Sequence, residues 1–536
     1  MDEATRKALR ALPAVEELLQ HARAATLLER YPRSQVVEAV RSVLRDTREA
    51  LVAAGDDVMG AGATAGATGP AAGGATGSET RGGVVGERIT TEDVLERASR
   101  VLESWSRPGL RKVLNLSGVV VHTNLGRSRL AADAVRQVVE VARSYSTLEY
   151  DLEQGDRGRR EVHVEELLKR LTGAEDAFAV NNNAGAVLLL LMGLASGREV
   201  LVSRGQLVEI GGSFRMPDIM RAGGVHLVEV GTTNRTRPAD YESAITPDTA
   251  MLLRVHTSNY RILGFTEETE LSDLVEIGRR HGLLVVDDLG SGALLELDAF
   301  RGEPTVASSL RSGVDLVCFS GDKLMGGPQA GILLGRGEVV QKLRRHPVAR
   351  ALRLDKMTLA ALEATLLLYQ DPERAQREIP TLQLMGRDAA ETVSLASALQ
   401  AAIEARCPDG YIVEVLESTG RAGGGSMPLV EIPSHAVRLR VPDSPPESGA
   451  RGGSARPVGV AGGPGGRGVP TGGVSALEAE LRRAPIPVVA RVSQDSLHLD
   501  VLALDAEDVG SVAESVAWAT QRLVSGDVGA AEGTEG

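Results

Sequence analysis

The middle of this 536-residue chain alternates short apolar runs with segments long enough to form helices. The runs span residues 176–180, 200–203, 225–230, 251–256, 283–287, 314–319 and 332–334. Each has the length and composition of a buried strand, and regular alternation with helices is typical of right-handed βαβ units. We therefore predict an α/β domain built on a mostly parallel sheet.

Two low-complexity stretches divide the chain. Residues 55–86 are rich in Gly, Ala and Thr, and residues 444–474 are rich in Gly, Pro and Arg. Neither has enough apolar side chains to offset the entropy of ordering, so we expect flexible insertions. The predicted domains are a helical N-terminal domain (1–54), a large α/β domain (87–371) and a small α+β C-terminal domain (372–536) that contains the second insertion.

The first 54 residues show helical periodicity. Apolar residues recur at helical spacing: Val36, Val40, Val43, Leu44 and Leu51. Arg41, Arg45 and Arg48 form a stripe on another face. Such a stripe is ordinarily a solvated face, and contact with nucleic acid is the alternative.

Charge and cysteine content narrow the class of protein. The formal net charge of −13 argues against non-specific nucleic-acid binding, although a local basic face is compatible with it. Cys318 and Cys407 can form neither a disulfide framework nor a self-contained zinc site, so we expect no metal, and Cys318 is interpreted as a core residue. The start lacks the features of a signal peptide, and the best apolar run, 186–191, is too short to cross a bilayer. These features predict a cytoplasmic protein without a membrane association.

A lysine lies in a glycine-rich turn directly after the apolar run 314–319. The turn, residues 320–331, reads SGDKLMGGPQAG and contains Lys323. Glycines let the backbone approach a flat cofactor closely, and an amine at a strand end can be desolvated so that its pKa falls and it becomes a nucleophile. This pattern favours a Schiff-base lysine for pyridoxal phosphate over a solvated loop lysine.

Two further features favour the same cofactor. The stretch from Asn181 to Gly185 follows a strand and opens an apolar helix, which is a setting for a phosphate. Asp287 and Asp288 end another strand, where a carboxylate can pair with a pyridine nitrogen. Neighbouring strand side chains face opposite ways, so only one aspartate can do this. We favour Asp288, which adjoins a glycine turn, and leave Asp287 as the alternative.

Eight long motifs in this order resemble bacterial selenocysteine synthase, a pyridoxal phosphate enzyme of the aminotransferase-like fold type I. They span residues 124–127, 145–150, 181–183, 203–215, 231–236, 256–261, 320–331 and 350–358. The resemblance begins in the N-terminal helical part, extends to about residue 384 and resumes at 423–428 and 487–502. Two departures lie near the expected cofactor: Gln206 replaces a glutamate and Gly185 replaces an alanine.

The resemblance implies conversion of L-seryl-tRNA(Sec) to L-selenocysteinyl-tRNA(Sec) with selenophosphate, through an aminoacrylyl intermediate on pyridoxal phosphate. It implies that Lys323 and Asp322 are catalytic, and that Arg127, Arg350 and Arg353 bind selenophosphate. The cofactor residues we expect are Lys323, Asp288, Asn182, Asn183 and Ala184. The resemblance also implies tRNA contact by the N-terminal domain and a homo-oligomer, suggested to be a decamer built from dimers.

Two other functions are compatible with parts of the pattern. A related pyridoxal phosphate lyase acting on a free amino acid or an amino sugar acid would use the same fold without needing RNA. A tRNA-binding scaffold without catalysis would not need Lys323, the aspartate pair or the asparagine loop.

Overall fold

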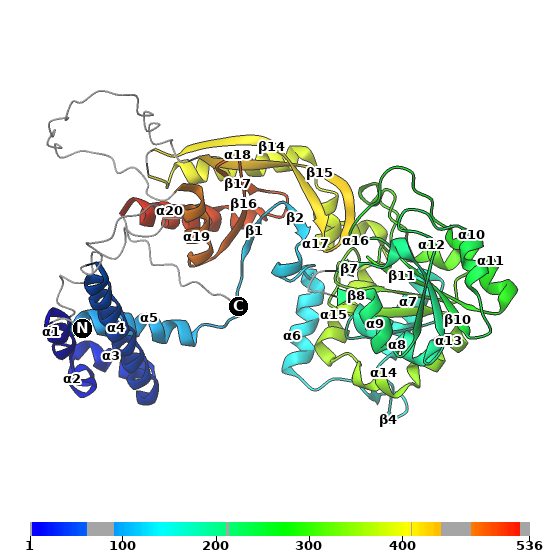
Figure 1. The fold of residues 1–536 in the computed structure, drawn as a ribbon, viewed down its shortest axis with the longest axis horizontal. Coiled ribbons are helices and arrows are strands. Elements are labelled where there is room, and N and C mark those ends of the chain that lie inside the picture. The colour runs from blue at the N-terminus through cyan, green and yellow to red at the C-terminus, as the bar shows by residue number, and fades with distance from the viewer. Residues whose placement is uncertain (1–2, 62–89, 211–213, 409, 441–472, 526–536) are drawn as a thin grey trace, which may run out of the picture. The chain divides into compact units, whose positions relative to one another are not determined.

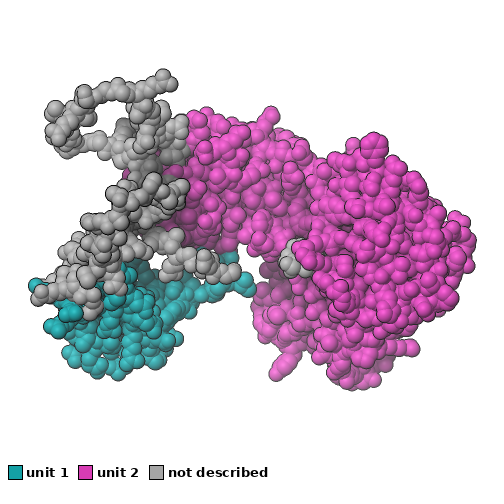
Figure 2. All heavy atoms as spheres, in the orientation of Figure 1, with its two compact units in different colours: residues 1–111 teal, residues 112–536 magenta. Residues whose placement is uncertain are grey.

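The computed structural model describes residues 3–61, 90–210, 214–408, 410–440 and 473–525 (Figure 1). The chain forms two compact units, residues 1–111 and 112–536 (Figure 2). Of the two predicted insertions, residues 62–86 and 444–472 lie outside the described residues. Residues 55–61 instead belong to a helix, and residues 473–474 begin another one.

The first unit consists of helices. They are α1 (Glu3–Arg10), α2 (Val15–Gln20), α3 (Ala22–Arg30), α4 (Arg33–Ala61) and α5 (Thr91–Ser106). The periodic residues Val36, Val40 and Leu44 are buried in its core, as their spacing predicts. The arginine stripe, Arg41, Arg45 and Arg48, is exposed on α4.

Helix α5 belongs to this helical unit, whereas the sequence placed it in the large domain. A capping box between Thr90 and Asp93 starts the helix. Its apolar stripe is buried in the same core as α4: Val94, Leu95, Ala98 and Leu102. An amphipathic helix must bury this stripe against a partner, so the boundary of the unit falls at Arg111 rather than before residue 87.

The second unit contains the predicted α/β sheet. Its seven strands are β5 (Asp176–Val180), β6 (Glu199–Ser203), β9 (His226–Val230), β10 (Thr249–Val255), β11 (Leu284–Gly290), β12 (Leu316–Ser320) and β13 (Gly331–Gly335), and each coincides with a predicted run. Their order is β5-β13-β12-β11-β10-β6-β9, and only β13 runs antiparallel to its neighbours. The prediction of an α/β fold with a mostly parallel sheet is confirmed.

Helices cover both faces of this sheet (Figure 1). Phe178 and Val180 of β5 face one core, which includes residues of α8 (Asn183–Ala195), α9 (Met216–Ala222) and α13 (Gly337–Arg344). Ala177 and Ala179 face the other core, with α7 (Val162–Thr172), α11 (Leu271–His281) and α12 (Val306–Arg311). Side chains alternate along a strand, so every strand contributes to both cores. The remaining elements here are α6 (Ala132–Arg143), α10 (Pro238–Ala244), α14 (Pro347–Ala351), α15 (Lys356–Leu368), α16 (Pro372–Glu378), α17 (Pro380–Met385), and the short strands β3 (Tyr150–Asp151), β4 (Asp156–Arg157), β7 (Glu209–Ile210) and β8 (Phe214–Arg215).

A second, six-stranded sheet combines C-terminal strands with two strands from before the α/β domain. Its order is β1-β16-β17-β15-β14-β2. The strands are β1 (Leu114–Leu116), β2 (Val119–Val121), β14 (Ile412–Gly423), β15 (Ser426–Arg440), β16 (Val488–Ser493) and β17 (Ser496–Asp500), and their core includes residues of α18 (Ala389–Glu404), α19 (Gly473–Arg483) and α20 (Val509–Ser525). β1 pairs with β16 and β2 with β14, so residues 114–121 belong with the C-terminal part and not with the large domain in which the sequence placed them.

In the part of the chain that the structure describes, no helix combines the length and apolarity needed to span a membrane.

Candidate active site

A cavity of about 260 Å³ lies at the carboxyl ends of β10, β11 and β12. This edge of a parallel sheet is the usual ligand crevice of open α/β folds. The cavity is lined by Arg127, Asn182, Asn183, Ala184, Val187, Val255, His256, Ser258, Asp288, Gly290, Ser320, Asp322, Lys323, Gln329 and Ala330. Seven of the nine predicted site residues therefore meet here, and only Arg350 and Arg353 do not.

Lys323 presents a buried amine to this cavity. The residue is 4% exposed, and its Nζ makes no hydrogen bond or ion pair with any described residue. Gly290 has a φ of +66°, and a Cβ at this position would lie 3.8 Å from Nζ, so the glycine brings the β11 turn close to the amine. Burial, and then the Arg127 charge, lower the pKa of Lys323, while Asp288, Asp322 and Glu303 oppose the shift. A lysine with a lowered pKa has a larger neutral, nucleophilic fraction.

The two adjacent aspartates have different partners. Asp287 is fully buried and forms a two-pronged ion pair with Arg254, with distances of 2.7 and 2.8 Å from Nε and Nη2 to its carboxylate oxygens. Asp288 lines the cavity, where Asn183 Nδ2 donates to its Oδ1 at 2.9 Å. Burial raises the pKa of Asp288, and the Asn183 hydrogen bond and the Lys323 charge counteract the shift. Only Asp288 is placed to meet a ligand in the cavity.

The start of α8 offers backbone donors to the same cavity. Asn182 is the N-cap, and its side chain accepts a hydrogen bond from Gly185 N at 2.8 Å. The N–H groups of Asn183 and Ala184 have no acceptor among the described residues. Two free donors at the N-terminus of a 13-residue helix form a suitable site for a phosphate.

The turn after β12 is held by a contact with the loop that carries Arg127. Arg127 Nη1 lies 3.0 Å from Asp322 Oδ2 and 3.2 Å from Oδ1. Ser128 Oγ donates to the backbone oxygens of Asp322 and Lys323 at 2.7 and 2.8 Å. Arg127 has a φ of 61°, a left-handed conformation that costs a non-glycine residue about 1–3 kcal/mol. Such strain is typical of functional sites.

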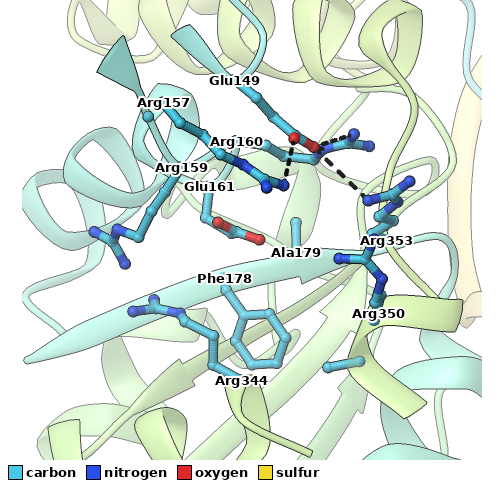
Figure 3. A pocket seen from close by; sticks show the side chains of 12 residues that line it. Glu149, Arg157, Arg159, Arg160, Glu161, Phe178, Ala179, Arg344, Arg350 and Arg353 are labelled. Carbon is cyan, nitrogen blue, oxygen red and sulfur yellow. Dashed lines mark hydrogen bonds and ion pairs between the residues drawn. The ribbon is translucent and has the colours of Figure 1, made fainter. Parts of the chain in front are cut away.

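The other two arginines expected to bind selenophosphate line a second pocket of about 290 Å³ (Figure 3). Arg353 lies 3.7 Å from Glu149 Oε1, and Arg160 lies 2.6 Å from the same oxygen. Hydrogen bonding by Arg160 lowers the pKa of Glu149, with a further contribution from Arg157. Arg350 is also in this pocket and has no ion pair with a described residue. Within one chain Arg350 and Arg353 thus line a different pocket from Arg127.

Of the two departures from the family pattern, the one at Gly185 has a local explanation. Gln206 Oε1 accepts a hydrogen bond from Val255 N at 3.1 Å, next to the cavity. A glutamate could also accept this hydrogen bond, so its replacement by Gln206 has no structural explanation. At Gly185, a Cβ would lie 3.1 Å from Asn181 Oδ1 and 3.3 Å from Leu352 Cδ2. Glycine therefore avoids a tight contact beside the backbone N–H groups that are free to bind a phosphate.

The sequence interpretation did not assign a role at this site to three residues. Cys318 is buried as expected for the core, and its Sγ also lies 3.5 Å from Asp288 Oδ1. His256 lines the cavity, and Glu303 lies behind it at 3.4 Å. His256 is within a recognised motif, but Glu303 is 47 positions farther along the chain, so no local pattern could link the two.

The residues present fit pyridoxal phosphate. Asn183 Oδ1 is buried without a partner in the described structure, so the cavity wall retains a polar atom for a ligand. The cavity supplies an amine for the aldehyde, a carboxylate for the pyridine nitrogen and two N–H donors for the phosphate.

Comparison with known proteins identifies the family. Residues 113–452 match the family described as L-seryl-tRNA selenium transferase, and residues 9–48 match the selenocysteine synthase N-terminal family. An L-seryl-tRNA(Sec) selenium transferase of Moorella thermoacetica is 44% identical over 97% of this chain and 99% of its own length. An L-seryl-tRNA(Sec) selenium transferase of Geotalea daltonii is 41% identical over 94% of this chain and 97% of its own length.

Among solved structures, a D-glucosaminate-6-phosphate ammonia-lyase aligns with a TM-score of 0.51, covering 79% of this chain and 98% of that chain. At 21% sequence identity this likeness concerns the fold alone, which is the aminotransferase-like fold type I. The matches in sequence extend over nearly the whole chain. The chain belongs to the L-seryl-tRNA selenium transferase family.

Proposed function

We propose that this protein converts L-seryl-tRNA(Sec) to L-selenocysteinyl-tRNA(Sec), with pyridoxal phosphate held at Lys323 and selenophosphate as the selenium donor. The observation that carries the proposal is the convergence of the Lys323 amine, the Asp288 carboxylate and the free N–H groups of Asn183 and Ala184 on one cavity, in a chain of this family. Each group matches one chemical requirement of the cofactor.

When bound, pyridoxal phosphate supplies an electron sink that acidifies the α-carbon of the seryl group. Lys323 would hold the cofactor through its amine and would accept the α-proton, because its lowered pKa enlarges the neutral fraction of the amine. Asp288 would pair with the pyridine nitrogen, and Asn183 Nδ2 holds the carboxylate in place by donating to Asp288 Oδ1. Asp322, held by Arg127, fixes the turn that carries the lysine.

Three arginines are proposed to hold selenophosphate, because planar guanidinium groups bind tetrahedral oxyanions through paired donors. Arg127 lines the Lys323 cavity, and Arg350 and Arg353 line the second pocket. Because the three arginines of one chain line two pockets, we infer that a second copy brings its own Arg350 and Arg353 to this cavity. That arrangement agrees with the homo-oligomer that the family resemblance implies.

The helical unit is the proposed contact with tRNA. It contains residues 9–48, which match the N-terminal family, and its arginine stripe is exposed. The chain is acidic overall, with a net charge of −13, so we expect recognition by local charge and RNA shape rather than by bulk attraction.

The test is to incubate the purified protein with pyridoxal phosphate, selenophosphate and seryl-tRNA(Sec), and to follow selenium entering the aminoacyl ester. Ordinary seryl-tRNA and free serine are the parallel substrates. Selenocysteinyl-tRNA formed from seryl-tRNA(Sec) supports the proposal. Turnover of a free amino acid without RNA, and none of the tRNA ester, would instead indicate a lyase.

A further inference from the structure

One histidine in the Lys323 cavity has no role in the function proposed so far. His256 directly follows β10, and its N–H donates to the Asp288 carbonyl oxygen at 2.9 Å. Its side chain is 13% exposed and lines the cavity. The backbone of His256 is therefore held on the same strand pair that carries Asp288, and its side chain lines the same cavity as Lys323.

A buried glutamate lies behind this ring. Glu303 follows a short 3-10 helix, Asp298–Phe300, and its N–H donates to the Phe300 carbonyl oxygen at 2.9 Å. Its side chain is 2% exposed, and Oε1 lies 3.4 Å from His256 Nε2. Within the described structure, no lysine or arginine forms an ion pair with Glu303.

An isolated buried carboxylate is costly, so its partner matters. Oε1 of Glu303 and Nε2 of His256 are both buried, and neither has a hydrogen-bond partner among the described residues. The two atoms face each other at ion-pair distance, and such contacts in ligand-free sites commonly shorten when substrate binds. The carboxylate can thus orient the ring and stabilise it when it carries a second proton, as the aspartate does in a Ser-His-Asp triad.

The second ring nitrogen remains available. Nδ1 of His256 makes no hydrogen bond with any described residue, and it is not among the fully buried atoms that lack a partner. Since Nε2 faces Glu303, Nδ1 is the ring nitrogen that can form a hydrogen bond with a molecule in the cavity.

Replacement of the seryl hydroxyl needs an acid as well as a base. A hydroxyl is a poor leaving group until it is protonated, and general acid catalysis contributes about 10²–10⁴-fold. Lys323 is the base in the proposed function. Asp288 is committed to the cofactor, and Asp322 is paired with Arg127 at 3.0 Å.

We infer that His256 is the catalytic acid that protonates the departing seryl hydroxyl, and that Glu303 is its positioning residue. The inference rests on the proposed function. The Cα–H bond breaks as its proton passes to Lys323, and its electron pair forms the Cα–Cβ double bond. The Cβ–Oγ bond breaks with its electron pair on oxygen, which takes the proton from Nδ1 of His256 and leaves as water. No net oxidation occurs.

The test compares two leaving groups. Seryl-tRNA(Sec) requires protonation of oxygen, whereas 3-chloroalanyl-tRNA(Sec) loses chloride without it. With seryl-tRNA(Sec), H256N and E303Q should form selenocysteinyl-tRNA about 10²-fold more slowly than the unmodified protein. With the chloro substrate, both variants should stay within about threefold of it.

Two further measurements separate this role from a structural one. In D₂O, both variants should still exchange the α-hydrogen of the seryl ester, because Lys323 is intact. Borohydride reduction should still attach the cofactor to Lys323. The matched control is E296Q, which makes the same change in a carboxylate of the preceding loop that is 77% exposed and paired with Arg311, and it should leave both rates unchanged.

An equal loss of rate with both leaving groups, or full activity of H256N on seryl-tRNA(Sec), would overturn the inference. So would loss of α-hydrogen exchange together with the hydroxyl reaction. An unmodified protein inactive on seryl-tRNA(Sec) would instead refute the proposed function, so the two failures are distinguishable.

Discussion

Arg127 Nη1 lies 3.0 Å from Oδ2 of Asp322, the residue that immediately precedes Lys323. The contact joins a strained arginine, 195 positions earlier in the chain, to the turn that presents the amine. The guanidinium both holds the turn and repels a protonated amine. Arg127 therefore influences the position and the protonation of Lys323 together.

The pH dependence of cofactor capture should follow from this contact. The neutral amine reacts with the aldehyde, so the rate rises as pH passes through the pKa of Lys323, which burial and Arg127 lower. R127Q removes the positive charge that repels the protonated amine, and it frees the negative charge of Asp322. Both changes raise the pKa of Lys323, so the rate of cofactor capture by R127Q should rise at a higher pH than in the unmodified protein. R127K keeps the charge and should stay near the original profile. The measurement is the rate of borohydride-trapped labelling of Lys323 against pH, and an unshifted R127Q profile would contradict the assignment.

The adjacent aspartates should respond differently to the same substitution. D287N removes the carboxylate charge that pairs with the guanidinium group of Arg254. Breaking a buried ion pair in this way costs about 3–5 kcal/mol of folding free energy. D288N should preserve the fold, because burial already disfavours the charge there, but it should weaken cofactor binding and slow turnover by roughly 10²-fold. Urea denaturation and cofactor titration distinguish the two effects. Equal destabilisation by both variants would show that Asp288 is structural.

Six of the seven strands of the α/β sheet were predictable because they are buried on both faces and therefore read as short apolar runs. The edge strand β9 is the exception, since His226 and Glu229 are exposed there. The long hairpin of β14 and β15 was not predicted. Most β14 residues are only partly buried, so the strand lacks a continuous apolar run, although the turn at Gly424 and Gly425 is visible as a glycine cluster. The pairing of β1 with β16 joins Leu114 to Val488, and no local pattern encodes a contact that distant.

The site was predictable where its residues follow strands directly, as Asp288 and Lys323 do. Sequence alone left Asp287 as an alternative, and the position of Arg254 on the neighbouring strand accounts for the difference between the two aspartates. Arg350 and Arg353 line a different pocket from Arg127 because of the way the chain folds after β13. The spacing of these arginines in the sequence does not predict that fold.

Selenophosphate binding by Arg350 and Arg353 can be tested without disturbing the cofactor. R350A/R353A should lower selenium transfer by at least roughly 10²-fold, because the oxyanion loses paired donors, while cofactor stays bound at Lys323. R157A is the matched control, since Arg157 lines the same pocket but its side chain is 75% exposed. Selenium transfer and the absorbance of bound cofactor are measured together. Loss of the cofactor from the double variant would refute the anion-binding role.

The close approach of β13 to the start of α8 should not tolerate a methyl group. A Cβ on Gly331 would lie 2.1 Å from Asn182 O and 2.8 Å from Asn183 N. G331A must therefore displace the loop that offers the phosphate donors, at a cost of about 1–3 kcal/mol, and should weaken cofactor binding. G337A, where a Cβ would meet only Glu175 Oε2 at 3.6 Å, is the control and should leave binding unchanged. The comparison requires cofactor dissociation constants and urea midpoints, and normal cofactor affinity in G331A would contradict the phosphate site.

Binding of tRNA by the arginine stripe of α4 should appear in the salt dependence of the affinity. Neutralising Arg41, Arg45 and Arg48 with glutamine should raise the KM for seryl-tRNA(Sec) and leave kcat unchanged, because the residues lie in the helical unit and the chemistry lies in the other. The slope of log affinity against log salt should decrease by about 0.7–0.9 for each RNA phosphate that the variant no longer neutralises. The matched control replaces the exposed Arg97, Arg100 and Arg107, which removes the same charge from another region of the helical unit. An equal fall in affinity in both variants would mean that bulk charge, and not the stripe, attracts the RNA.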